Sequence, residues 1–255
     1  MDSKEIVKRQ FDLQAENFRN WSVTRNEGYM QAYFKFIGLQ QDDELLDVAC
    51  GTGEFSAFCA RRIKAVHGID ISQGMIDLAR KQASADGLTN LTFECHDVEH
   101  TPCVSNSFSV VQCRSAFHHM ENNSLVFKEM LRSCRPGGRL AVQDIMAYED
   151  SRVNSFFEAL EKEVDVSHHA ALHRKEFIDL FNRNRVEIIR SWVVEVELNF
   201  REYLSHAHQS ASSLEKIRGL LEEGLQDRDI SRFLYLNEDN ELVLKRAVFL
   251  ILGRK

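Results

Sequence analysis

Residues 45–55 read Leu45-Leu-Asp-Val-Ala-Cys-Gly-Thr-Gly-Glu-Phe55, and this stretch predicts how the fold begins. Its apolar first half is typical of a buried strand, and Gly51 and Gly53 then form a turn that leads into a helical pattern. Because glycine has no Cβ, a ligand can lie against the backbone at such a turn. The first N–H groups of the helix point at the same ligand. The stretch therefore predicts a strand, a ligand-binding turn and a helix.

The alternation of strand and helix continues to about residue 145. We expect strands over 44–50, 65–69, 91–95, 108–113 and 139–145, and helices over 53–62, from Ser72 to before Gly87, and over 124–134. Strands that alternate with helices form parallel β-α-β units, whose sheet is covered on both faces. The pattern predicts an α/β sandwich.

Two regions depart from this alternation. The first 40 residues are expected to be helical and carry a run of aromatic side chains. Further helices are expected over about 148–182 and 200–233, with strands over 186–198 and 242–252. Because no linker composition marks a boundary, we expect one domain over 1–255. Its parts would be an N-terminal helical cap over 1–40, a core over 44–146 and helical insertions over 148–240 around the sixth strand.

Composition narrows the class of protein. The chain has 255 residues, and 32 Lys and Arg against 39 Asp and Glu give a formal charge of −7, which disfavours a nucleic-acid partner. No apolar run approaches the roughly 20 residues of a membrane span, and the N-terminus lacks an apolar signal segment. Six scattered cysteines without a C-x-x-C pair favour reduced thiols. These features predict a cytoplasmic protein.

Asp70 is the second candidate binding element, after the glycine turn. It closes the second strand, 70 − 47 = 23 positions after Asp47, where a carboxylate can accept hydrogen bonds from a ribose diol. A dinucleotide enzyme would carry G-x-G-x-x-G, yet the first and last of those glycines are missing here. Asp47 beside the turn also favours a cationic cofactor over a pyrophosphate. An NAD-dependent dehydrogenase stays open as a weaker alternative.

Five segments in order resemble the motifs of class I S-adenosylmethionine (SAM)-dependent methyltransferases. They are Leu46–Gly53, Gly68–Ser72, His96–Glu99, Ser107–His119 and Arg135–Leu140. Within that family the chain is most similar to the ubiquinone/menaquinone-biosynthesis C-methyltransferase-like group. The resemblance implies a Rossmann-like sandwich with a mostly parallel seven-stranded sheet, an antiparallel last strand and helical cap segments. It also implies that residues 44–146 bind SAM.

The resemblance further implies roles for single residues. Ala49, Gly51 and Gly53 would line the methionine arm, and Asp70 would hold the ribose hydroxyls. Ile71, Met75, Asp97 and Val98 would surround the adenine, with the Asp97 carboxylate accepting from its amino group and the Val98 N–H donating to the ring. Arg114 would lie near the cofactor's carboxylate or the substrate. The chain departs from the family pattern at Ser109, where the family usually has an acid.

His118 and His119 are the candidates for a catalytic base, which is needed only where the acceptor must lose a proton. The alternative is that one caps a loop and the other packs. His168, His169 and His173 contain an i, i+4 spacing typical of a metal pair on a helix, but no third ligand stands nearby, so we expect a partly exposed helix face and no metal. Glu161, Glu163 and Asp165 are likewise expected to form a solvated face. The aromatic residues of the N-terminal cap either line a ligand pocket or pack in the core.

The sequence therefore predicts an S-adenosylmethionine-dependent methyltransferase that acts on a small-molecule acceptor by in-line displacement and releases S-adenosylhomocysteine. A catalytically silent SAM-binding or partner-binding protein is the alternative. The Asn/Asp-Pro-Pro-Tyr/Phe signature of nucleic-acid amino-methylating enzymes is missing after the fourth strand, where Arg114-Ser-Ala-Phe117 stands. The final strand is expected to offer an edge through which a homodimer could pair.

Overall fold

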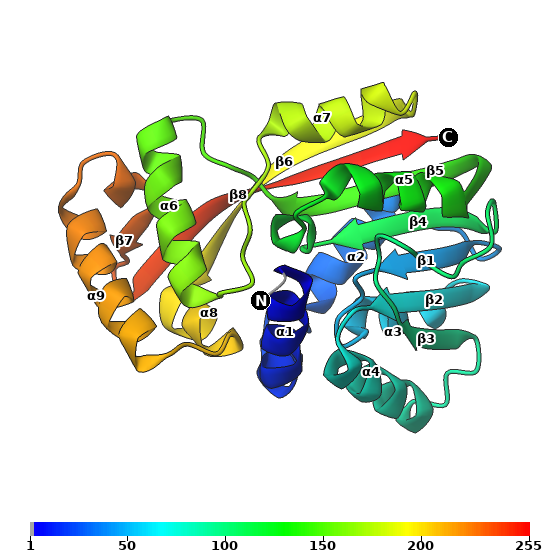
Figure 1. Ribbon diagram of the computed structural model, residues 1–255, viewed down its shortest axis with the longest axis horizontal. Helices are drawn as coiled ribbons and strands as arrows, with labels where there is room; N and C mark the ends of the chain where they lie inside the picture. The colour runs from blue at the N-terminus through cyan, green and yellow to red at the C-terminus, as the bar shows by residue number, and fades with distance from the viewer. Residues whose placement is uncertain (1–2) are drawn as a thin grey trace.

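The structure, a computed structural model, describes residues 3–255. Within these residues the apolar runs form one sheet of eight strands. Their bounds are β1 Glu44–Val48, β2 Ala65–Asp70, β3 Leu91–Cys95, β4 Phe108–Arg114, β5 Cys134–Ile145, β6 Glu187–Asn199, β7 Leu234–Leu236 and β8 Leu242–Arg254. The strand order is β3-β2-β1-β4-β5-β8-β6, and β7 pairs with the first residues of β8 (Figure 1).

Strands β1 to β5 run parallel, and β8 runs antiparallel to both β5 and β6. The predicted α/β sandwich with a mostly parallel sheet and an antiparallel last strand is therefore confirmed. The sheet has one strand more than the seven predicted, because residues 234–236, beyond the predicted helical segment, pair with residues 242–244.

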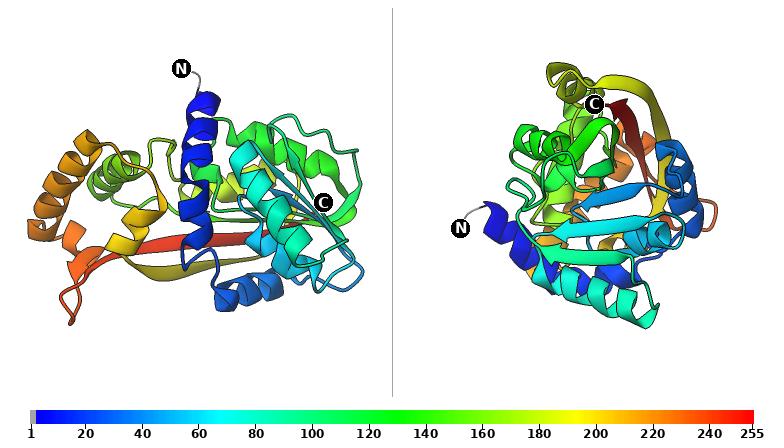
Figure 2. Two further views of the ribbon diagram at one scale, coloured as in Figure 1. Left: turned by 90° about the horizontal axis from the view of Figure 1, so that it is seen from below. Right: turned by 90° about the vertical axis from the view of Figure 1, so that its right-hand side faces the viewer.

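Helices cover both faces of this sheet (Figure 2). Neighbouring residues of a strand point to opposite faces, so Leu45 packs in one buried cluster and Leu46 in the other. The first cluster is covered by α2 Glu27–Ile37, α3 Glu54–Ala60 and α4 Gln73–Ala85, and the second by α5 Asn123–Ser133 and α7 Arg174–Arg183. The predicted N-cap Ser72 does begin α4, because its hydroxyl accepts from the Met75 N–H at 3.1 Å.

A third buried cluster lies at the other end of the molecule. It joins α6 Ser151–Val164, α8 Phe200–His206, α9 Ala211–Gln226 and β7 around side chains such as Phe157 and Leu160. Strands β6 and β8 are long enough to extend from the parallel part of the sheet to this third cluster. Helix α1 Ser3–Asn20 lies between these two ends of the molecule (Figure 1). The first two residues of the expected cap over 1–40 lie outside the described part, and the single domain over 1–255 stays a prediction.

Two expectations about the second half of the chain were wrong. The helix predicted over 148–182 is interrupted, since α6 ends at Val164 and α7 begins at Arg174. The Asp165 carboxylate accepts from the Ser167 N–H at 2.9 Å, a local turn that competes with helix continuation. His168 and His169 therefore lie in a loop, and His173 is the N-cap of α7.

The final strand is not an edge. β8 is paired with β5 on one side and with β6 on the other, so it offers no free edge for a second copy of the chain. A homodimer stays a prediction, and it would have to use another surface. No helix in the described residues is both long and apolar enough to cross a membrane.

Candidate functional site

A cavity of about 380 Å³ opens at the carboxyl ends of β1, β2 and β4, and its walls continue to α1, α6, α8 and the inner parts of β6 and β8. Such an edge is where open α/β sheets bind ligands. Ten of the eleven residues predicted for the site line this cavity: Ala49, Gly51, Asp70, Ile71, Met75, Asp97, Val98, Arg114, His118 and His119. Gly53 is the exception.

The turn after β1 has an unusual backbone. Ala49 and Gly51 both have a φ of 56°, and Gly53 has a φ of 80°, in the left-handed region that favours glycine. A Cβ on Gly53 would lie 2.6 Å from Cζ of Phe93 and 3.0 Å from Cβ of Ala79. Gly53 therefore allows the start of α3 to pack on β3 and α4, and it supports the turn from behind the cavity wall.

Asp70 holds the same turn from the neighbouring strand. Its Oδ2 accepts from the Gly51 N–H at 2.8 Å, and its Oδ1 accepts from the Ser72 N–H at 2.9 Å. Burial raises the pKa of Asp70 above its usual value, although these two N–H groups oppose the shift. The carboxylate thus joins the glycine turn to the start of α4 while one side of it faces the cavity.

Asp47 and Arg114 both line the next part of the cavity wall. The Asp47 carboxylate accepts from Ser56 Oγ and Gln112 Nε2, and burial raises its pKa to about 6. The Arg114 guanidinium lies 5.1 Å above the ring of Phe55 and forms no hydrogen bond or ion pair with any described residue. Arg114 is thus a cation in the cavity wall that has no carboxylate partner among the described residues.

Asp97 is already paired in this structure. Lys4 Nζ lies 2.7 Å from its Oδ2 and 2.6 Å from Oε2 of Glu99. Burial raises the pKa of Asp97, but the hydrogen bond and charge of Lys4 outweigh burial, so the pKa is lowered overall. The residue expected to contact the adenine therefore also holds the first turn of α1.

Further contacts make α1 a bridge between the two ends of the molecule. Asp12 Oδ1 accepts from Ser72 Oγ at 2.6 Å and from the Gly74 N–H at 2.9 Å, at the start of α4. Gln14 Nε2 donates to Asp165 Oδ2 at 3.1 Å, on the loop after α6. One helix thus touches both the start of α4 and the loop after α6, on two sides of the cavity.

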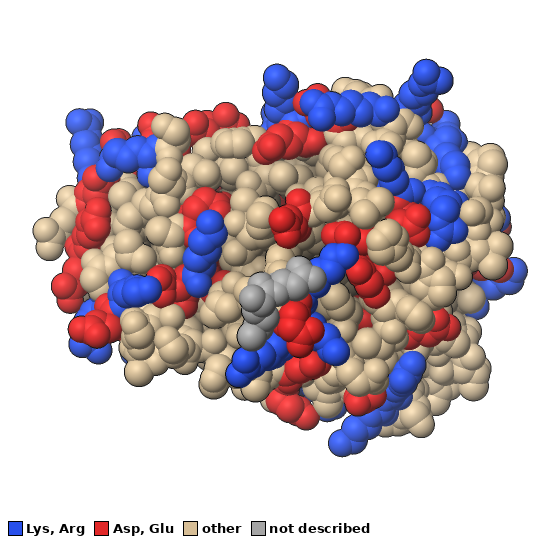
Figure 3. All heavy atoms as spheres, in the orientation of Figure 1, with Lys and Arg blue, Asp and Glu red and all other residues tan. Residues whose placement is uncertain are grey.

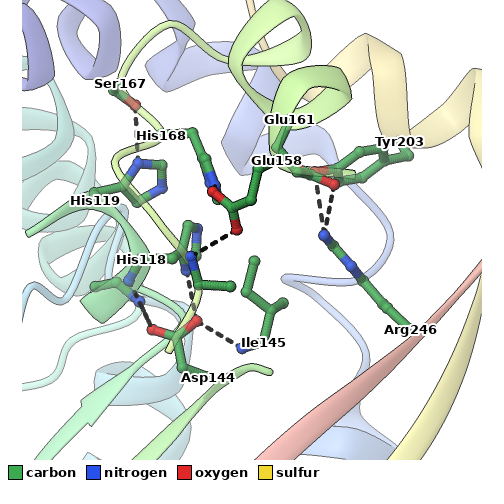
Figure 4. Close-up of polar contacts among 12 residues, drawn as sticks. His118, His119, Asp144, Ile145, Glu158, Glu161, Ser167, His168, Tyr203 and Arg246 are labelled. Carbon is green, nitrogen blue, oxygen red and sulfur yellow. Dashed lines mark hydrogen bonds and ion pairs between the residues drawn. The ribbon is translucent and has the colours of Figure 1, made fainter. Parts of the chain in front are cut away.

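His118 is fixed by Asp144, a buried residue near the end of β5 that the sequence reasoning did not select (Figure 4). Its Nδ1 lies 2.5 Å from Oδ1 of Asp144, whose Oδ2 accepts from the N–H groups of Ala116 at 3.0 Å and His118 at 3.2 Å. Burial alone lowers the pKa of His118, but the charge and hydrogen bond of Asp144 outweigh it and raise the pKa overall.

His119 is held in a different way. Its Nδ1 lies 3.0 Å from Ser167 Oγ, whose single proton goes to Asp165 Oδ1 at 2.6 Å (Figure 4). The hydroxyl must therefore accept from His119 Nδ1–H, which leaves Nε2 with its lone pair. Burial and the neighbouring His118 lower the pKa of His119 well below its usual value, so the ring is neutral at pH 7. A neutral ring with a free nitrogen lone pair can accept a proton.

Several site residues were missed or misread from sequence. His168 is buried and its Nε2 lies 2.9 Å from Oε2 of Glu158, so it is not on an exposed helix face. Glu161 and Asp165 are buried too, and not part of a solvated face. Within residues 3–255 no group of three or more His, Cys, Asp or Glu is arranged to hold a metal ion.

Arg246 lies at the far wall with Glu161 and Tyr203. Its Nη2 donates to Glu161 Oε1 at 2.5 Å and its Nη1 to Tyr203 Oη at 3.2 Å, while that hydroxyl donates to Glu161 Oε2. A sequence signal existed for Arg246 and for Asp144: each is a charged residue close to an apolar run of its strand, which is 247–252 for Arg246 and 140–142 for Asp144. Such residues are rarely buried without a partner.

Comparison with known proteins agrees with this geometry. Residues 45–138 match a methyltransferase domain family. The chain is 32% identical to methyltransferase GfsG of Streptomyces halstedii over 47% of this chain and 44% of that protein. It is 27% identical to a demethylmenaquinone methyltransferase of Symbiobacterium thermophilum over 54% and 58%. The chain thus spans about half the length of these two relatives.

A solved structure extends the likeness to most of the chain. The YcgJ protein of Bacillus subtilis has a TM-score of 0.79 at 21% identity, covering 90% of this chain and 99% of that one. The domain match covers residues 45–138, and the likeness to the solved structure shows that the two proteins share the same class of fold. The matched domain belongs to the methyltransferase class. Within that class the resemblance to ubiquinone and menaquinone methyltransferases, predicted from the motifs, is confirmed.

Proposed function

We propose that this chain transfers the methyl group of S-adenosylmethionine to a small-molecule acceptor by in-line displacement. The observation that carries the proposal is one continuous cavity, which runs from the glycine turn after β1 past His118 and His119 to the cap helices. When bound, S-adenosylmethionine supplies an activated methyl group on a cationic sulfur. The chain's part is to hold the acceptor in line and to exclude water.

The charge of the cavity supports a cationic donor. Eight carboxylate residues line it, against Lys4, Arg114 and Arg246. Lys4 and Arg246 are already ion-paired, so negative charge is in excess and favours a sulfonium. Arg114, which has no partner among the described residues, is suited to the carboxylate of a methionine arm.

The other residues of the proposed donor site follow the motif roles. Ala49 and Gly51 would border the methionine arm through their backbone, and Asp70 would accept from the ribose hydroxyls. Ile71, Met75 and Val98 would enclose the adenine. Asp97 would bind its amino group alongside Lys4. Gly53 would act only by allowing the turn to form.

The walls beyond the histidines support a small acceptor. They combine the apolar sheet face of Val194, Val196 and Val248 with the rings of Trp21 and Trp192. On the face drawn in Figure 3, Lys and Arg side chains are scattered among Asp and Glu and do not gather into one patch. A nucleic-acid partner would need such a patch.

His119 would be the base for an acceptor that must lose a proton, because its Nε2 carries a lone pair in the neutral ring. His118 contributes through its contact with Asp144, which raises the pKa of His118, while His118 in turn lowers the pKa of His119. Both histidines border the cavity between the donor side and the cap.

Calorimetric titration with S-adenosylmethionine, S-adenosylhomocysteine and NAD tests the donor. Binding of the first two without the third is expected, and binding of NAD alone would refute the proposal. Transfer of a labelled methyl group to any member of a small-molecule library then separates an enzyme from a silent binding protein. As a matched pair, Arg114→Met should weaken donor binding, whereas Arg135→Met, an exposed position outside the cavity, should not.

A further inference from the structure

We propose that Asp165 is a positioning residue for the methyl-transfer reaction. Acting through the hydroxyl of Ser167, it holds the His119 ring in the tautomer and the orientation that leave Nε2 free to take a proton from the acceptor. This inference rests on the proposed function, because it concerns the base for the acceptor. It assigns a role to a buried carboxylate whose hydrogen bonds go to Ser167 and Gln14 and not to the base itself.

The first observation is the direction of the hydrogen bonds. A carboxylate only accepts, so the Ser167 hydroxyl donates its single proton to Asp165 Oδ1 at 2.6 Å. The same hydroxyl lies 3.0 Å from His119 Nδ1 and can only accept there. Without the carboxylate the hydroxyl would be free to donate to Nδ1, and the proton of the neutral ring would then sit on Nε2. Asp165 therefore decides which nitrogen of His119 keeps a lone pair.

The second observation is that the Asp165 carboxylate is held from two sides. It is 5% exposed, and its Oδ1 also accepts from the Ser167 N–H at 2.9 Å. That contact alone would make the turn after α6, so the bond from the hydroxyl is additional to it. Oδ2 accepts at 3.1 Å from Nε2 of Gln14, a fully buried residue of α1 that itself accepts from Gln10 Nε2 at 3.1 Å. With both oxygens held, the carboxylate offers the hydroxyl one direction in which to donate.

The third observation is the contrast between the two adjacent histidines. His118 Nδ1 contacts a carboxylate directly, with Asp144 Oδ1 at 2.5 Å, and this contact raises the pKa of His118. At His119 the Ser167 hydroxyl lies between the ring and the carboxylate. A hydroxyl orients the ring without placing a negative charge against it. The arrangement therefore sets the tautomer of His119 and leaves the ring neutral.

The tautomer matters for the proton-transfer step. The bond between the acceptor atom and its proton breaks, an N–H bond forms at His119 Nε2, and the electron pair stays on the acceptor atom. That atom bonds to the methyl carbon, and the electron pair of the broken C–S bond goes to sulfur, which loses its positive charge. A neutral ring that already carried its proton on Nε2 could not take up the acceptor's proton there.

NMR of protein labelled with nitrogen-15 at histidine tests the assignment, because long-range proton–nitrogen couplings distinguish the two neutral tautomers. The signals of His119 are those missing from His119→Gln. At pH 7 the wild-type ring should be mainly in the Nδ1–H form, with and without S-adenosylhomocysteine. In Asp165→Ala the ratio of the Nδ1–H to the Nε2–H form should fall at least about fivefold. A wild-type ring that is mainly in the Nε2–H form would overturn the proposal without the need for any Asp165 variant.

Ser167→Ala separates an effect relayed by the hydroxyl from a direct effect of the Asp165 charge. In the Ser167→Ala background, Asp165→Ala should change the tautomer ratio of His119 by less than about twofold. Glu163→Ala is the matched control, because it removes a carboxylate of α6 that pairs with Lys216 outside the cavity, and it should retain the wild-type ratio. An unchanged ratio in Asp165→Ala, or an equal change with and without Ser167, contradicts the assignment.

Failure of this inference and failure of the proposed function are distinguishable, because calorimetry on the same samples measures the binding of S-adenosylhomocysteine. If it does not bind the wild-type chain, the methyltransferase proposal fails. If it binds the wild type and Asp165→Ala with similar affinity while the tautomer ratio of His119 does not change, only the positioning role of Asp165 fails.

Discussion

His119 Nε2 is the atom on which the proposed acid–base chemistry depends. Changing His119 to Ala should lower turnover about 100-fold or more, because general-base catalysis commonly contributes that much. The affinity for S-adenosylmethionine should change by less than about threefold, since the donor is held by other residues. Steady-state kinetics on an identified acceptor, together with calorimetry on the donor, measure the two effects separately.

His169→Ala is the matched control for that substitution, because His169 lies in the same part of the fold with an exposed side chain. It should leave turnover close to that of the wild type. The turnover of Ser167→Ala should lie between those of His119→Ala and His169→Ala, since this substitution removes the partner that fixes the His119 ring. Equal losses of turnover and donor affinity in His119→Ala would rule out the role of a base.

Gly53 allows a residue-scale test of the fold. Gly53→Ala should lower the free energy of unfolding by about 2–5 kcal/mol, because it adds an unfavourable positive φ and an overlap with Phe93. Gly87→Ala shares the positive φ, 65° against 80°, but its new Cβ meets no atom within 4 Å. Gly87→Ala should therefore lower the free energy of unfolding by only about 1–2 kcal/mol. Urea unfolding of both variants checks the difference, and equal losses would show that the overlap is relieved.

Among the elements, α1 is the one whose contacts predict a response to ligand. It is held mainly by polar contacts to Asp97, Ser72 and Asp165, and only three of its residues are buried. Segments with few buried apolar contacts open locally at low cost. We therefore predict that amide hydrogen exchange over residues 11–21 slows when S-adenosylmethionine is added.

Lys4→Ala sharpens this test of α1. It removes the ion pairs with Asp97 and Glu99, so exchange over residues 11–21 should be faster than in the wild type before the donor is added. Exchange over β1, inside the sheet, serves as the internal reference. If the donor binds and exchange over residues 11–21 does not change, α1 is not a lid.

For the whole molecule, buried histidines set the response to pH. Burial lowers the pKa values of His67, His119 and His206 below the value of about 6.5 for an unfolded chain. The unfolded chain then binds more protons below pH 6.5, so their stabilisation is present above that pH and is lost as pH falls. The raised pKa of His118 has the opposite effect. The stabilisation that His118 contributes is complete below about pH 6.5 and is lost as the pH rises.

Asp47, whose pKa is raised to about 6, acts in the same direction as His118 between pH 7 and pH 5. Because three lowered histidines oppose these two groups in this range, the free energy of unfolding should decrease from pH 7 to pH 5. Urea unfolding at several pH values measures this slope. His206→Phe should flatten it, since phenylalanine keeps a ring beside Trp21, which stacks on His206 at 4.5 Å, and takes up no proton. An unchanged slope in that variant would mean that His206 is not among the groups responsible.

Much of the core could be predicted because its signals are local. The glycine turn at 51–53, the cap at Ser72 and the periodicity between residues 44 and 145 each lie within one element or at its end. The pairs that complete the site are not local. His118 and Asp144 are 26 positions apart, and Arg246 and Glu161 are 85 apart. No pattern within one element indicates which of these charged residues will meet.

The sequence by itself determined the order of strands and helices and the glycine turn after β1, and it carried the motifs on which the proposed reaction rests, because backbone geometry and periodicity depend on neighbouring residues. Only the tertiary structure decided that residues 165–173 leave the helix, that β8 lies inside the sheet and that α1 joins the two ends of the cavity. It also decided which histidine is neutral, because burial and charge depend on residues brought together from distant parts of the chain.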